Sequence, residues 1–402
     1  MNIEQQVEYL MLGTEYGDEA LRRTMADELR QRLIEADKEG RPLRVYAGYD
    51  PRKADLHLGH TVTMRKLRQF QELGHEVTFL IGNYTSLIGD PSDKDVLRPQ
   101  LTRDEVAENG RTYAEQAFRI LDPQKTLIRY NAEWLSHLTF EQLIRLASNF
   151  TIQQFMTRES FKLRWERNDA VYLHEFFYAI MQGYDAYSLK ADVQVGGTDQ
   201  LFNIVTAARK VMTFLGAKPN IAIILGILPG TDGVVKMSKS LGNHIPINTD
   251  AEDLYGKVMS IPDFAMSSFF RLVTRWEPPQ IETIEKALND GSMHPRDAKM
   301  KLAYEVAASF YGEEDAQKAQ GAFVSKFQKK ETPDEMPEFK LEGAMNIVDV
   351  LIATHLATSR GEARRLIEQK GVRINNEVVN DLKLIATQGV LQVGKRNFVR
   401  LN

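Results

Sequence analysis

Apolar and polar residues alternate along the first 235 residues with two periods, and these periods divide the stretch into helices and strands. Leu21, Met25, Leu29 and Leu33 recur near the period of a helix within 15–38. Short, almost wholly apolar runs predict buried strands, and amphipathic runs between them predict helices. The predicted strands are 43–50, 75–82, 125–131, 191–200 and 221–228, and the predicted helices among them are 57–73, 103–120, 139–165, 172–188 and 201–215. This alternation predicts an α/β fold with a doubly wound, Rossmann-type parallel sheet over 1–235.

The pattern changes twice after this first domain. Residues 236–328 begin with a lysine-bearing loop and continue as an all-helical stretch. Residues 329–343 contain two prolines and many charges, a composition typical of a linker. The last stretch, 344–402, mixes helix and strand signals and predicts a separate small α+β domain.

Short local signals define elements within the last domain. Ser359 followed by Glu362 predicts a capping box at the start of a helix. Gly371 is the expected end of that helix. A hairpin is predicted around Asn375–Asn376, and two short strands are expected on either side of Lys395 and Arg396.

Composition narrows the class of protein. The 402 residues include no cysteine, so disulfides, thiolate metal sites and cysteine nucleophiles are excluded. We expect no secretory signal and no membrane span, and therefore a cytoplasmic protein. The net charge is −4, but 344–402 hold nine basic and five acidic residues, so the rest of the chain carries −8. A basic end on an acidic body is typical of a contact with nucleic acid.

Three motifs follow predicted strands, where open α/β sheets bind their ligands. His57, Gly59 and His60 stand where the first strand gives way to a helix, whose free N–H groups suit a phosphate. VQVGGTDQ ends another strand, and KMSKS, residues 236–240, follows the last one. Lys236 and Lys239 would stabilise the charge that develops on a leaving pyrophosphate. The flanking pairs Asp232–Gly233 and Gly242–Asn243 would allow the loop to move.

Each motif alone has a simpler interpretation. The two histidines are also compatible with core packing or with zinc, although no third ligand stands nearby. KMSKS alone is compatible with a solvated basic loop. Their joint occurrence at strand ends, in this order, favours a nucleotide site.

Six motifs in this order resemble those of a known family. HLGH and KMSKS are similar to the two signatures of class I aminoacyl-tRNA synthetases. YAGYDP, LIGDPS, YAIMQGYD and QVGGTDQ complete a resemblance to bacterial-type tyrosyl-tRNA synthetases that covers nearly the whole chain. The resemblance implies activation of L-tyrosine by ATP, with Mg²⁺ on the phosphates and no protein-bound metal, followed by transfer of the tyrosyl group to tRNA(Tyr).

The resemblance also implies roles for individual residues. Tyr46 and Asp185 would bind the substrate phenol, and Asp90, Tyr178 and Gln182 would bind its ammonium, with Gln194 completing the shell. The expected catalytic groups are His57, His60, Lys236, Lys239, Lys94 and Arg98. The expected ATP contacts are Gly48, Asp50, Gly59, Thr63, Gly196, Gly197, Asp199, Gln200 and Ser240.

These assignments have alternatives and one departure from the family. Tyr178, Gln182 and Asp185 are also compatible with a helix that has one polar edge, and Asp90 with a simple Asp-Pro turn. Lys94 and Arg98 are also compatible with an exposed charged loop. Relatives often have a small polar residue after the first-strand tyrosine, and the methyl group of Ala47 gives no hydrogen bond to ribose.

The C-terminal domain resembles the small RNA-binding domain named after the fourth protein of the small ribosomal subunit. Its expected phosphate contacts are Arg360, Arg364, Arg365, Lys370 and Arg373. A solvated basic helix is the alternative. In relatives the helical stretch 247–328 takes part in RNA binding, and His294, Arg296 and Lys299 are its candidates here.

Relatives are homodimers, so we expect a dimer interface formed by a helical insertion near 130–175. Trp134, Phe150, Phe155 and Phe161 are candidates for that interface and equally for the core. Three rival functions stay open at this point. They are a tryptophanyl-tRNA synthetase, a non-catalytic RNA-binding factor on a synthetase fold, and a simple nucleotidyltransferase.

Overall fold

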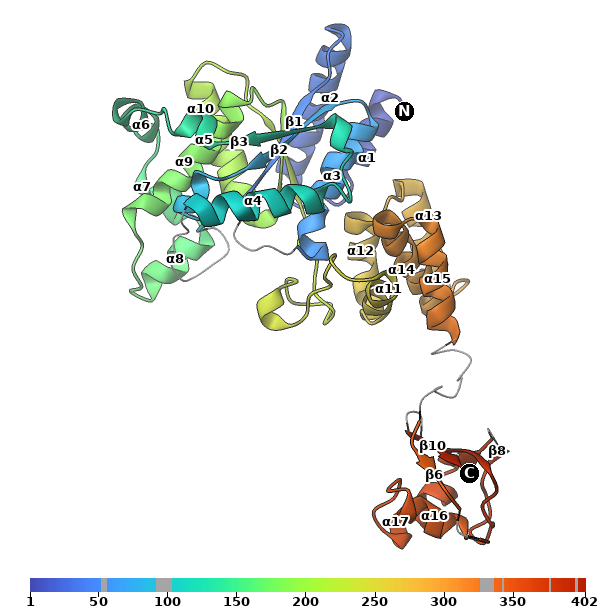
Figure 1. The fold of residues 1–402 in the computed structure, drawn as a ribbon. Coiled ribbons are helices and arrows are strands. Elements are labelled where there is room, and N and C mark those ends of the chain that lie inside the picture. The colour runs from blue at the N-terminus through green and yellow to red at the C-terminus, as the bar shows by residue number, and fades with distance from the viewer. Residues whose placement is uncertain (52–55, 92–102, 326–335, 342, 376, 395–396) are drawn as a thin grey trace. The chain divides into compact units, whose positions relative to one another are not determined.

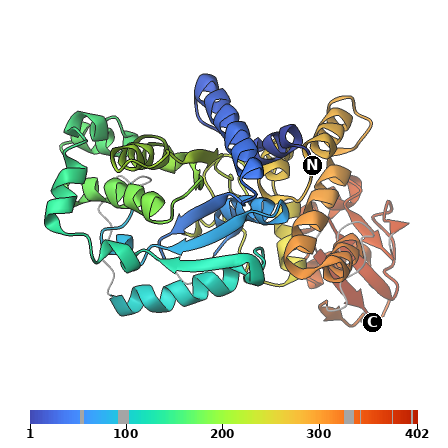
Figure 2. The same ribbon diagram turned by 90° about the horizontal axis from the view of Figure 1, so that it is seen from above.

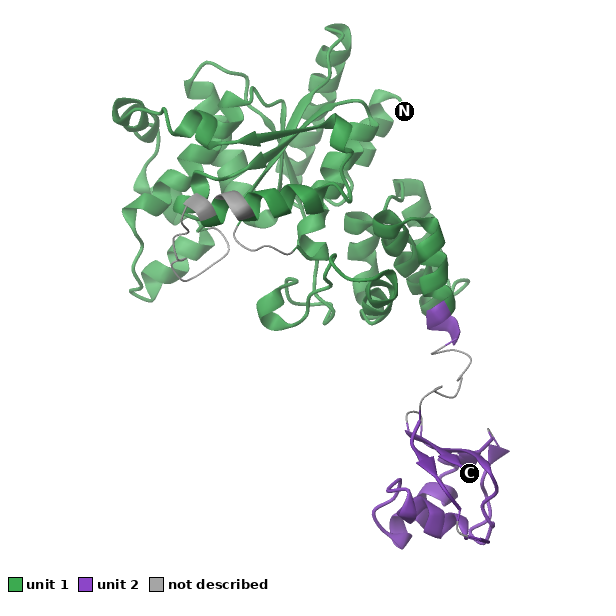
Figure 3. Ribbon diagram, viewed as in Figure 1, with its two compact units in different colours: residues 1–321 green, residues 322–402 purple. Residues whose placement is uncertain are grey.

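The computed structural model describes residues 1–51, 56–91, 103–325, 336–341, 343–375, 377–394 and 397–402. The chain divides into two compact units, Met1–Gly321 and Ala322–Asn402, coloured green and purple in Figure 3. Among the described residues, no helix has both the length and the apolar character that a membrane crossing needs.

A five-stranded parallel sheet forms the centre of the first unit (Figure 1). Its strands are β1 (Arg44–Tyr49), β2 (Glu76–Ile81), β3 (Thr126–Tyr130), β4 (Val193–Gly197) and β5 (Ile221–Leu225). They lie in the order β3-β2-β1-β4-β5, which confirms the predicted doubly wound sheet. The order reverses between β1 and β4, and such switch points are where open α/β sheets bind ligands.

Helices cover both faces of this sheet. Helix α3 (Leu58–Glu72) packs on β1, β2 and β4. The side chains of Tyr46 and Leu80 point the other way and pack against Ala186, Ala208 and Met212. The last three belong to α9 (Leu173–Ser188), the π-helix η4 (Phe202–Ala208) and α10 (Arg209–Phe214). Figure 2 shows the blue strands β1 and β2 between the cyan helix α4 (Arg103–Ala117) and the green helices.

The N-terminal segment adds α1 (Ile3–Met11) and α2 (Glu19–Lys38). The buried side chain of Lys66 on α3 donates to the carbonyl oxygens of Tyr9 and Leu12 at the C-terminal end of α1. Short 3₁₀ turns complete the connections along this unit: η1 (Thr85–Leu87), η2 (Pro123–Lys125), η3 (Thr198–Gln200), η5 (Lys239–Leu241) and η6 (Asp263–Ala265).

The prediction of one helical stretch over 139–165 was wrong in detail. The structure has α5 (Ala132–Leu135) and then three short helices, α6 (Phe140–Ala147), α7 (Ile152–Met156) and α8 (Glu159–Glu166). Thr139 and Thr151 each start a new helix through a capping box with the glutamine three residues later. Similarly, the helix predicted over 201–215 begins as the π-helix η4, because apolar spacing over two turns does not separate π from α geometry.

The aromatic candidates for a dimer interface lie in the core of this region. Phe155 is 3% and Phe161 0% exposed, and Phe150 packs against the same cluster. The indole N–H of Trp134 donates to Asp185, 2.7 Å away. Of the two interpretations left open, the structure favours core packing for these four side chains.

The segment after the sheet is helical and belongs to the first unit as far as Gly321. Residues of α11 and α14 pack on each other, α12 packs on α3, and Arg119 after α4 donates to the carbonyl oxygen of Ile247, 2.7 Å away. The helices are α11 (Ala251–Met259), α12 (Met266–Val273), α13 (Pro278–Asn289), α14 (Pro295–Tyr311) and α15 (Glu313–Phe323).

The second unit has the predicted α+β composition, with a sheet in the order β6-β10-β9-β7-β8. Its core includes Ile347, Leu351, Ile367 and Leu391. The elements are β6 (Glu338–Phe339), α16 (Ile347–Ala353), α17 (Arg360–Glu368), β7 (Val372–Ile374), β8 (Glu377–Val378), β9 (Gly389–Val393) and β10 (Asn397–Leu401).

Two details of helix α17 differ from the prediction. Ser359 caps the N–H of Glu362, but the Glu362 carboxylate accepts hydrogen bonds from Thr358 instead of completing the box with Ser359. The helix ends at Glu368, and the left-handed residue after it is Lys370, with φ 58°, not Gly371. The predicted hairpin is present, since Ile374 pairs with Glu377.

Candidate active site

The first motif caps helix α3 with its own imidazoles. The Nδ1 atom of His57 accepts the N–H of Gly59, and the N–H of His57 donates to Nδ1 of His60, each over 3.2 Å. The two rings lie 3.8 Å apart. Because both Nδ1 atoms accept hydrogen bonds, each neutral ring carries its proton on Nε2. The turn therefore presents two uncharged N–H donors beside the start of a helix.

Burial keeps His57 uncharged. Its side chain is 8% exposed, and burial, followed by the charges of His60, His244, Lys239 and Lys236, lowers its pKa to about 2. A neutral imidazole donor is compatible with a nearby lysine, whereas a second cation in the same place is unfavourable.

The lysine loop, which we define as residues 229–245, lies against this turn. The N–H of Leu58 donates to the carbonyl oxygen of Ile245 over 2.8 Å, and His57 forms an isolated bridge with Pro246. A Cβ placed on Gly59 would lie 3.4 Å from Cβ of Met237. The structure thus brings the histidine turn and KMSKS to the same edge of the sheet.

The glycine turn of VQVGGTDQ, at the end of β4, contacts the lysine loop through an ion pair. Nζ of Lys236 lies 3.3 Å from Oδ2 of Asp199, which follows β4. A Cβ on Gly196 would lie 2.5 Å from the terminal methyl group of Ile204 and 3.0 Å from Cβ of Gln200, so this glycine allows close packing against η4. A Cβ on Gly197 would lie 2.6 Å from the Asp199 carboxylate. A Cβ on Gly48 of β1 would lie 3.9 Å from Leu80, an ordinary contact and the nearest one within the described part of the chain.

Asp185 lies in a fully buried site. It accepts the indole N–H of Trp134 over 2.7 Å and the amide of Asn131 over 3.2 Å. Burial raises its pKa to about 8, although both hydrogen bonds oppose that change. The hydroxyl of Tyr46 is buried and has no hydrogen-bond partner among the described residues. Its pKa is raised by burial and by the nearby charge of Asp185.

Residues expected to bind the substrate ammonium form hydrogen bonds with residues expected to bind ATP. Tyr178 donates its hydroxyl to Asp50 over 3.1 Å, and Gln200 donates to Asp90 over 2.5 Å. Arg158 adds a charge 3.9 Å from the Asp90 carboxylate. Hydrogen bonds therefore link members of the two expected sets.

The amides of this group differ in their surroundings. The carbonyl oxygen of Gln182 is buried without a hydrogen-bond partner in the described part of the chain. The carbonyl oxygen of Gln194 accepts from the amide of Asn220 over 3.0 Å. The amide oxygen of Gln182 is therefore available to accept a hydrogen bond, whereas the amide oxygen of Gln194 already accepts one.

Two of the expected ATP contacts are hydroxyl groups, those of Thr63 and Ser240. Thr63 shares a hydrogen bond of 2.9 Å with the hydroxyl of Tyr49, whose ring stacks on Phe79. Ser240 is exposed, and its hydroxyl lies 2.9 Å from that of Ser238. Lys94 and Arg98, the other expected catalytic groups, lie outside the described residues.

Several residues of the site gave no sequence signal. Trp134 and Asn131 reach Asp185 from 51 and 54 positions earlier in the chain, so no local pattern links them. Arg158, expected only as part of a helix, approaches Asp90. Asn243 is next to a glycine and was interpreted as part of a hinge, although its side chain is 7% exposed and hydrogen-bonded.

Four of the five residues expected to contact RNA in the second unit are exposed to solvent. Arg364, Arg365 and Lys370 are exposed. Arg360 is exposed but pairs with Asp349 at 2.7 Å, and Arg373 is half-buried on β7. In the first unit, His294 caps α14, Arg296 pairs with Asp297, and Lys299 pairs with Asp263.

Known protein families match this chain along its length. The model for class I tRNA synthetases (W and Y) matches residues 38–328, and the model for the tyrosine–tRNA ligase SYY-like C-terminal domain matches 328–400. The parallel sheet, the capped HLGH turn and the lysine loop together define a class I aminoacyl-tRNA synthetase.

Individual relatives narrow the class further. The tyrosine–tRNA ligase of Thermotoga maritima is 45% identical over 95% of this chain and 96% of its own length. That of Haemophilus influenzae is 48% identical over 92% of each chain. The chain belongs to the tyrosine–tRNA ligase family. The solved tyrosyl-tRNA synthetase of Archaeoglobus fulgidus, complexed with L-tyrosine, shares the fold, with a TM-score of 0.61, 24% identity, and coverage of 80% of this chain and 100% of that one.

Proposed function

We propose that this chain activates L-tyrosine with ATP and transfers the tyrosyl group to the 3′-terminal ribose of tRNA(Tyr). A carboxylate oxygen of tyrosine attacks the α-phosphorus in line, and the bond from that phosphorus to the pyrophosphate oxygen breaks. The ribose hydroxyl then attacks the tyrosyl carbonyl, and AMP leaves. The observation that carries the proposal is the convergence of the His57 turn, Asp199 and Lys236 at the switch point of the sheet.

The tyrosine pocket, defined by Tyr46, Asp185, Trp134 and Asn131, would recognise the substrate phenol. Trp134 and Asn131 hold the Asp185 carboxyl, and the Tyr46 hydroxyl still has hydrogen-bonding capacity. A phenol placed between Tyr46 and Asp185 satisfies both groups. A phenylalanine ring leaves both buried polar groups unsatisfied, which is costly. Tyr178, Asp90 and Gln182 would bind the ammonium.

Catalysis would depend on positioning and electrostatics without a protein nucleophile. The Nε2–H groups of His57 and His60 are uncharged donors for the phosphates, and Lys236 and Lys239 supply positive charge. Asp50, Asp199, Gln200, Thr63 and the glycines would bind the nucleoside. We expect Mg²⁺ to arrive with the phosphates, since it usually keeps water and phosphate ligands. Lys94 and Arg98 stay candidates for the pyrophosphate.

Amino-acid-dependent exchange of pyrophosphate into ATP tests this proposal. We expect exchange with tyrosine for the wild type, and loss of exchange at ordinary tyrosine concentrations for Asp185→Ala. Asp290→Ala, an exposed aspartate in the helical segment, is the control and should keep full activity. Exchange with tryptophan alone would identify a tryptophanyl enzyme. RNA binding without exchange for any amino acid would identify a non-catalytic factor.

The second unit would bind the tRNA through Arg364, Arg365 and Lys370. Exposed basic side chains on one helix and the turn after it can neutralise phosphates, so binding should weaken as salt rises. Changing Arg364 and Arg365 together to alanine should lower tRNA affinity and leave tyrosine-dependent exchange unchanged. Lys383→Ala, an exposed basic residue elsewhere in the unit, is the control. Equal loss in both variants would contradict a localised patch.

A protein with this task belongs in the cytoplasm, where tRNA is charged.

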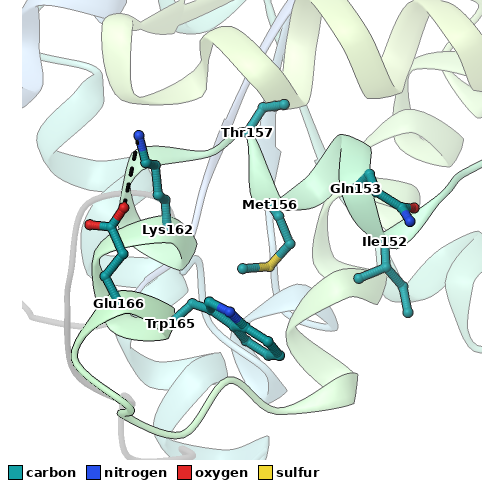
Figure 4. A pocket seen from close by; sticks show the side chains of 7 residues that line it. All are labelled: Ile152, Gln153, Met156, Thr157, Lys162, Trp165 and Glu166. Atoms are coloured by element: carbon teal, nitrogen blue, oxygen red, sulfur yellow. Dashed lines mark ion pairs between the residues drawn. The ribbon is translucent and has the colours of Figure 1, made fainter.

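We also propose that the chain is a homodimer through the segment 127–173. Among the described residues, this segment holds nine of the eighteen exposed large apolar side chains, including Phe140 at 76%, Trp165 at 68% and Leu173 at 71%. Figure 4 shows Trp165, Met156 and Ile152 around an open hollow of ≈ 430 Å³ between α7 and α8. Large exposed apolar surfaces are typical of protein interfaces.

Sedimentation velocity tests the dimer. Trp165→Glu places a charge in this face and should shift the protein towards monomer at micromolar concentration. Phe214→Glu replaces an exposed apolar residue outside the segment, 42% exposed, and should leave the dimer intact. A wild type that sediments as a monomer would contradict the proposal.

A further inference from the structure

One side chain, Asn243, connects the two arms of the lysine loop. Its amide oxygen accepts the N–H of Ser238 over 2.8 Å. Its amide nitrogen donates to Oδ2 of Asp232 over 2.5 Å and lies 3.3 Å and 3.4 Å from the carbonyl oxygens of Val235 and Lys236. The amide group thus contacts the backbone on both sides of Lys236 and Met237.

The space around Asn243 is closed. Its side chain is 7% exposed. A Cβ placed on Gly230 would lie 2.3 Å from the Asn243 amide, so only glycine fits opposite it. The N–H of Thr231 donates to the backbone oxygen of Asn243 over 2.9 Å. A side chain held in this way has one conformation available.

Asp232, on the other arm of the lysine loop, pairs with Asn243, and we call these two side chains the brace. Its Oδ1 atom accepts the N–H groups of Val234 and Val235, each over 2.7 Å, while Oδ2 accepts from Asn243. The Asp232 carboxylate and the Asn243 amide therefore hydrogen-bond to each other, and each also hydrogen-bonds to backbone groups of the loop. The two pairs expected to allow the loop to move, Asp232–Gly233 and Gly242–Asn243, thus contain two side chains that hydrogen-bond to each other.

The brace determines where Lys236 lies. Pro229 and Lys236 form an isolated bridge, and the N–H of Met237 donates to the carbonyl oxygen of Leu228 over 3.1 Å. Met237 is 2% exposed and packs beside Gly59 of the histidine turn. From this fixed backbone, the long side chain of Lys236 reaches Asp199.

We propose that Asn243, paired with Asp232, is a positioning residue for the activation step, because it holds the loop backbone from which Lys236 reaches the triphosphate. This inference rests on the proposed role of Lys236. It predicts that losing the brace lowers the rate of adenylate formation and leaves tyrosine binding unchanged. Among the hydrogen bonds of the described residues, none joins the tyrosine pocket to Asn243.

Asn243→Asp is the sharpest test, because it sets a second carboxylate against Asp232. We expect kcat for tyrosine-dependent exchange to fall by about tenfold to a hundredfold, as for the loss of a buried hydrogen bond with like-charge repulsion. The equilibrium dissociation constant of tyrosine should stay within about twofold. Adding Asp232→Asn to this variant recreates the pair in mirror image and should recover much of the loss.

Two further variants keep the test decisive. Asn248→Asp makes the same chemical change at an exposed position next to the loop and should leave kcat unchanged. Asn243→Ala removes the amide without adding a charge. It should still lower kcat by about threefold to tenfold. If Asn243→Asp does not fold, this variant alone decides the result.

Three results would overturn the inference. They are an unchanged kcat in Asn243→Ala, a loss of tyrosine affinity that equals the loss of kcat, or a double variant no better than Asn243→Asp alone. Lys236→Ala, measured in parallel, separates this inference from the proposed function. If Lys236→Ala loses activity and Asn243→Ala does not, only the role of Asn243 fails. If the wild type shows no exchange, the proposed function itself fails.

Discussion

The tyrosine pocket and the lysine loop lie at the same edge of the sheet, but the chain holds them by different means. In the pocket, the functional group itself is fixed, because Asp185 is buried and receives two hydrogen bonds from other elements. In the loop, the backbone is fixed by Asn243, while the amine of Lys236 is on an exposed side chain. In the tyrosine pocket the functional group itself is held in place. In the lysine loop the backbone is held in place, while the side chain that carries the functional amine is exposed.

This difference indicates a division of tasks. A buried, fixed carboxyl selects a ligand by the cost of leaving polar groups unpaired, so changes there act on substrate binding. An exposed amine gains most when it meets the charge that develops on a polyphosphate, so changes there act on the rate.

The largest effect is expected for Lys236→Ala. Loss of a positioned charge at the transition state should lower kcat for pyrophosphate exchange by about 10²–10³. Tyrosine affinity, measured by equilibrium dialysis without ATP, should stay the same. A matching loss of tyrosine affinity would remove the distinction between the loop and the pocket.

A smaller effect, of the opposite kind, is expected for Trp134→Phe. This change keeps the aromatic surface and removes one donor from Asp185, so the KM for tyrosine should rise about tenfold with a smaller change in kcat. Trp165→Phe, which changes an exposed indole, is the matched control. An effect on kcat alone would show that Trp134 does not act through substrate binding.

The buried carboxyl also predicts a pH-dependent stability. Asp185 has a pKa of about 8 in the fold against 3.8 as an ordinary aspartate, so the folded state favours the protonated form. Its contribution is fully present below about pH 4 and is lost as the pH rises to about 8. Asp185→Asn lacks this titration. We expect the free energy of unfolding of the wild type, relative to this variant, to fall by at least about 1.4 kcal/mol over that range.

Urea unfolding at a series of pH values, without tyrosine, measures this difference. A difference between wild type and Asp185→Asn that does not change with pH would show that the carboxyl is already ionised in the fold. The pocket would then recognise tyrosine with a charged acceptor throughout.

The smallest effect is expected for Ser240→Ala. The hydroxyl is exposed and, within the described part of the chain, bonds to that of Ser238. Its loss should change kcat for exchange by no more than about threefold, because an exposed hydrogen bond contributes little. A loss as large as that of Lys236→Ala would mean that this hydroxyl binds the transition state directly.

Local patterns were enough to predict the sheet and the positions of its motifs. β2 and β5 are short apolar runs, and the three motifs follow predicted strands in the sequence, with His57 eight residues after the end of β1, Gly196 within β4 and Lys236 eleven residues after the end of β5. The helices of 139–165 were merged because capping at Thr151 interrupts a pattern that stays amphipathic on both sides.

Long-range contacts were not predictable from the sequence. Tyr178 meets Asp50 across 128 positions, and Trp134 meets Asp185 across 51. No periodicity connects such pairs, because packing of several elements determines them. Asn243 is different, since its partners are close in sequence. A Gly-Asn pair at a loop end predicts a place where the loop can move, and it does not predict the hydrogen bonds of the Asn243 side chain.

The most direct test of the central claim is a crystal structure of the full chain with tyrosine, Mg²⁺ and a non-hydrolysable ATP analogue. We predict a triphosphate between the Nε2 atoms of His57 and His60 on one side and the amine of Lys236 on the other, with Lys236 released from Asp199. Phosphates bound beyond the hydrogen-bonding reach of both imidazoles, or on the side of the sheet away from Lys236, would contradict it.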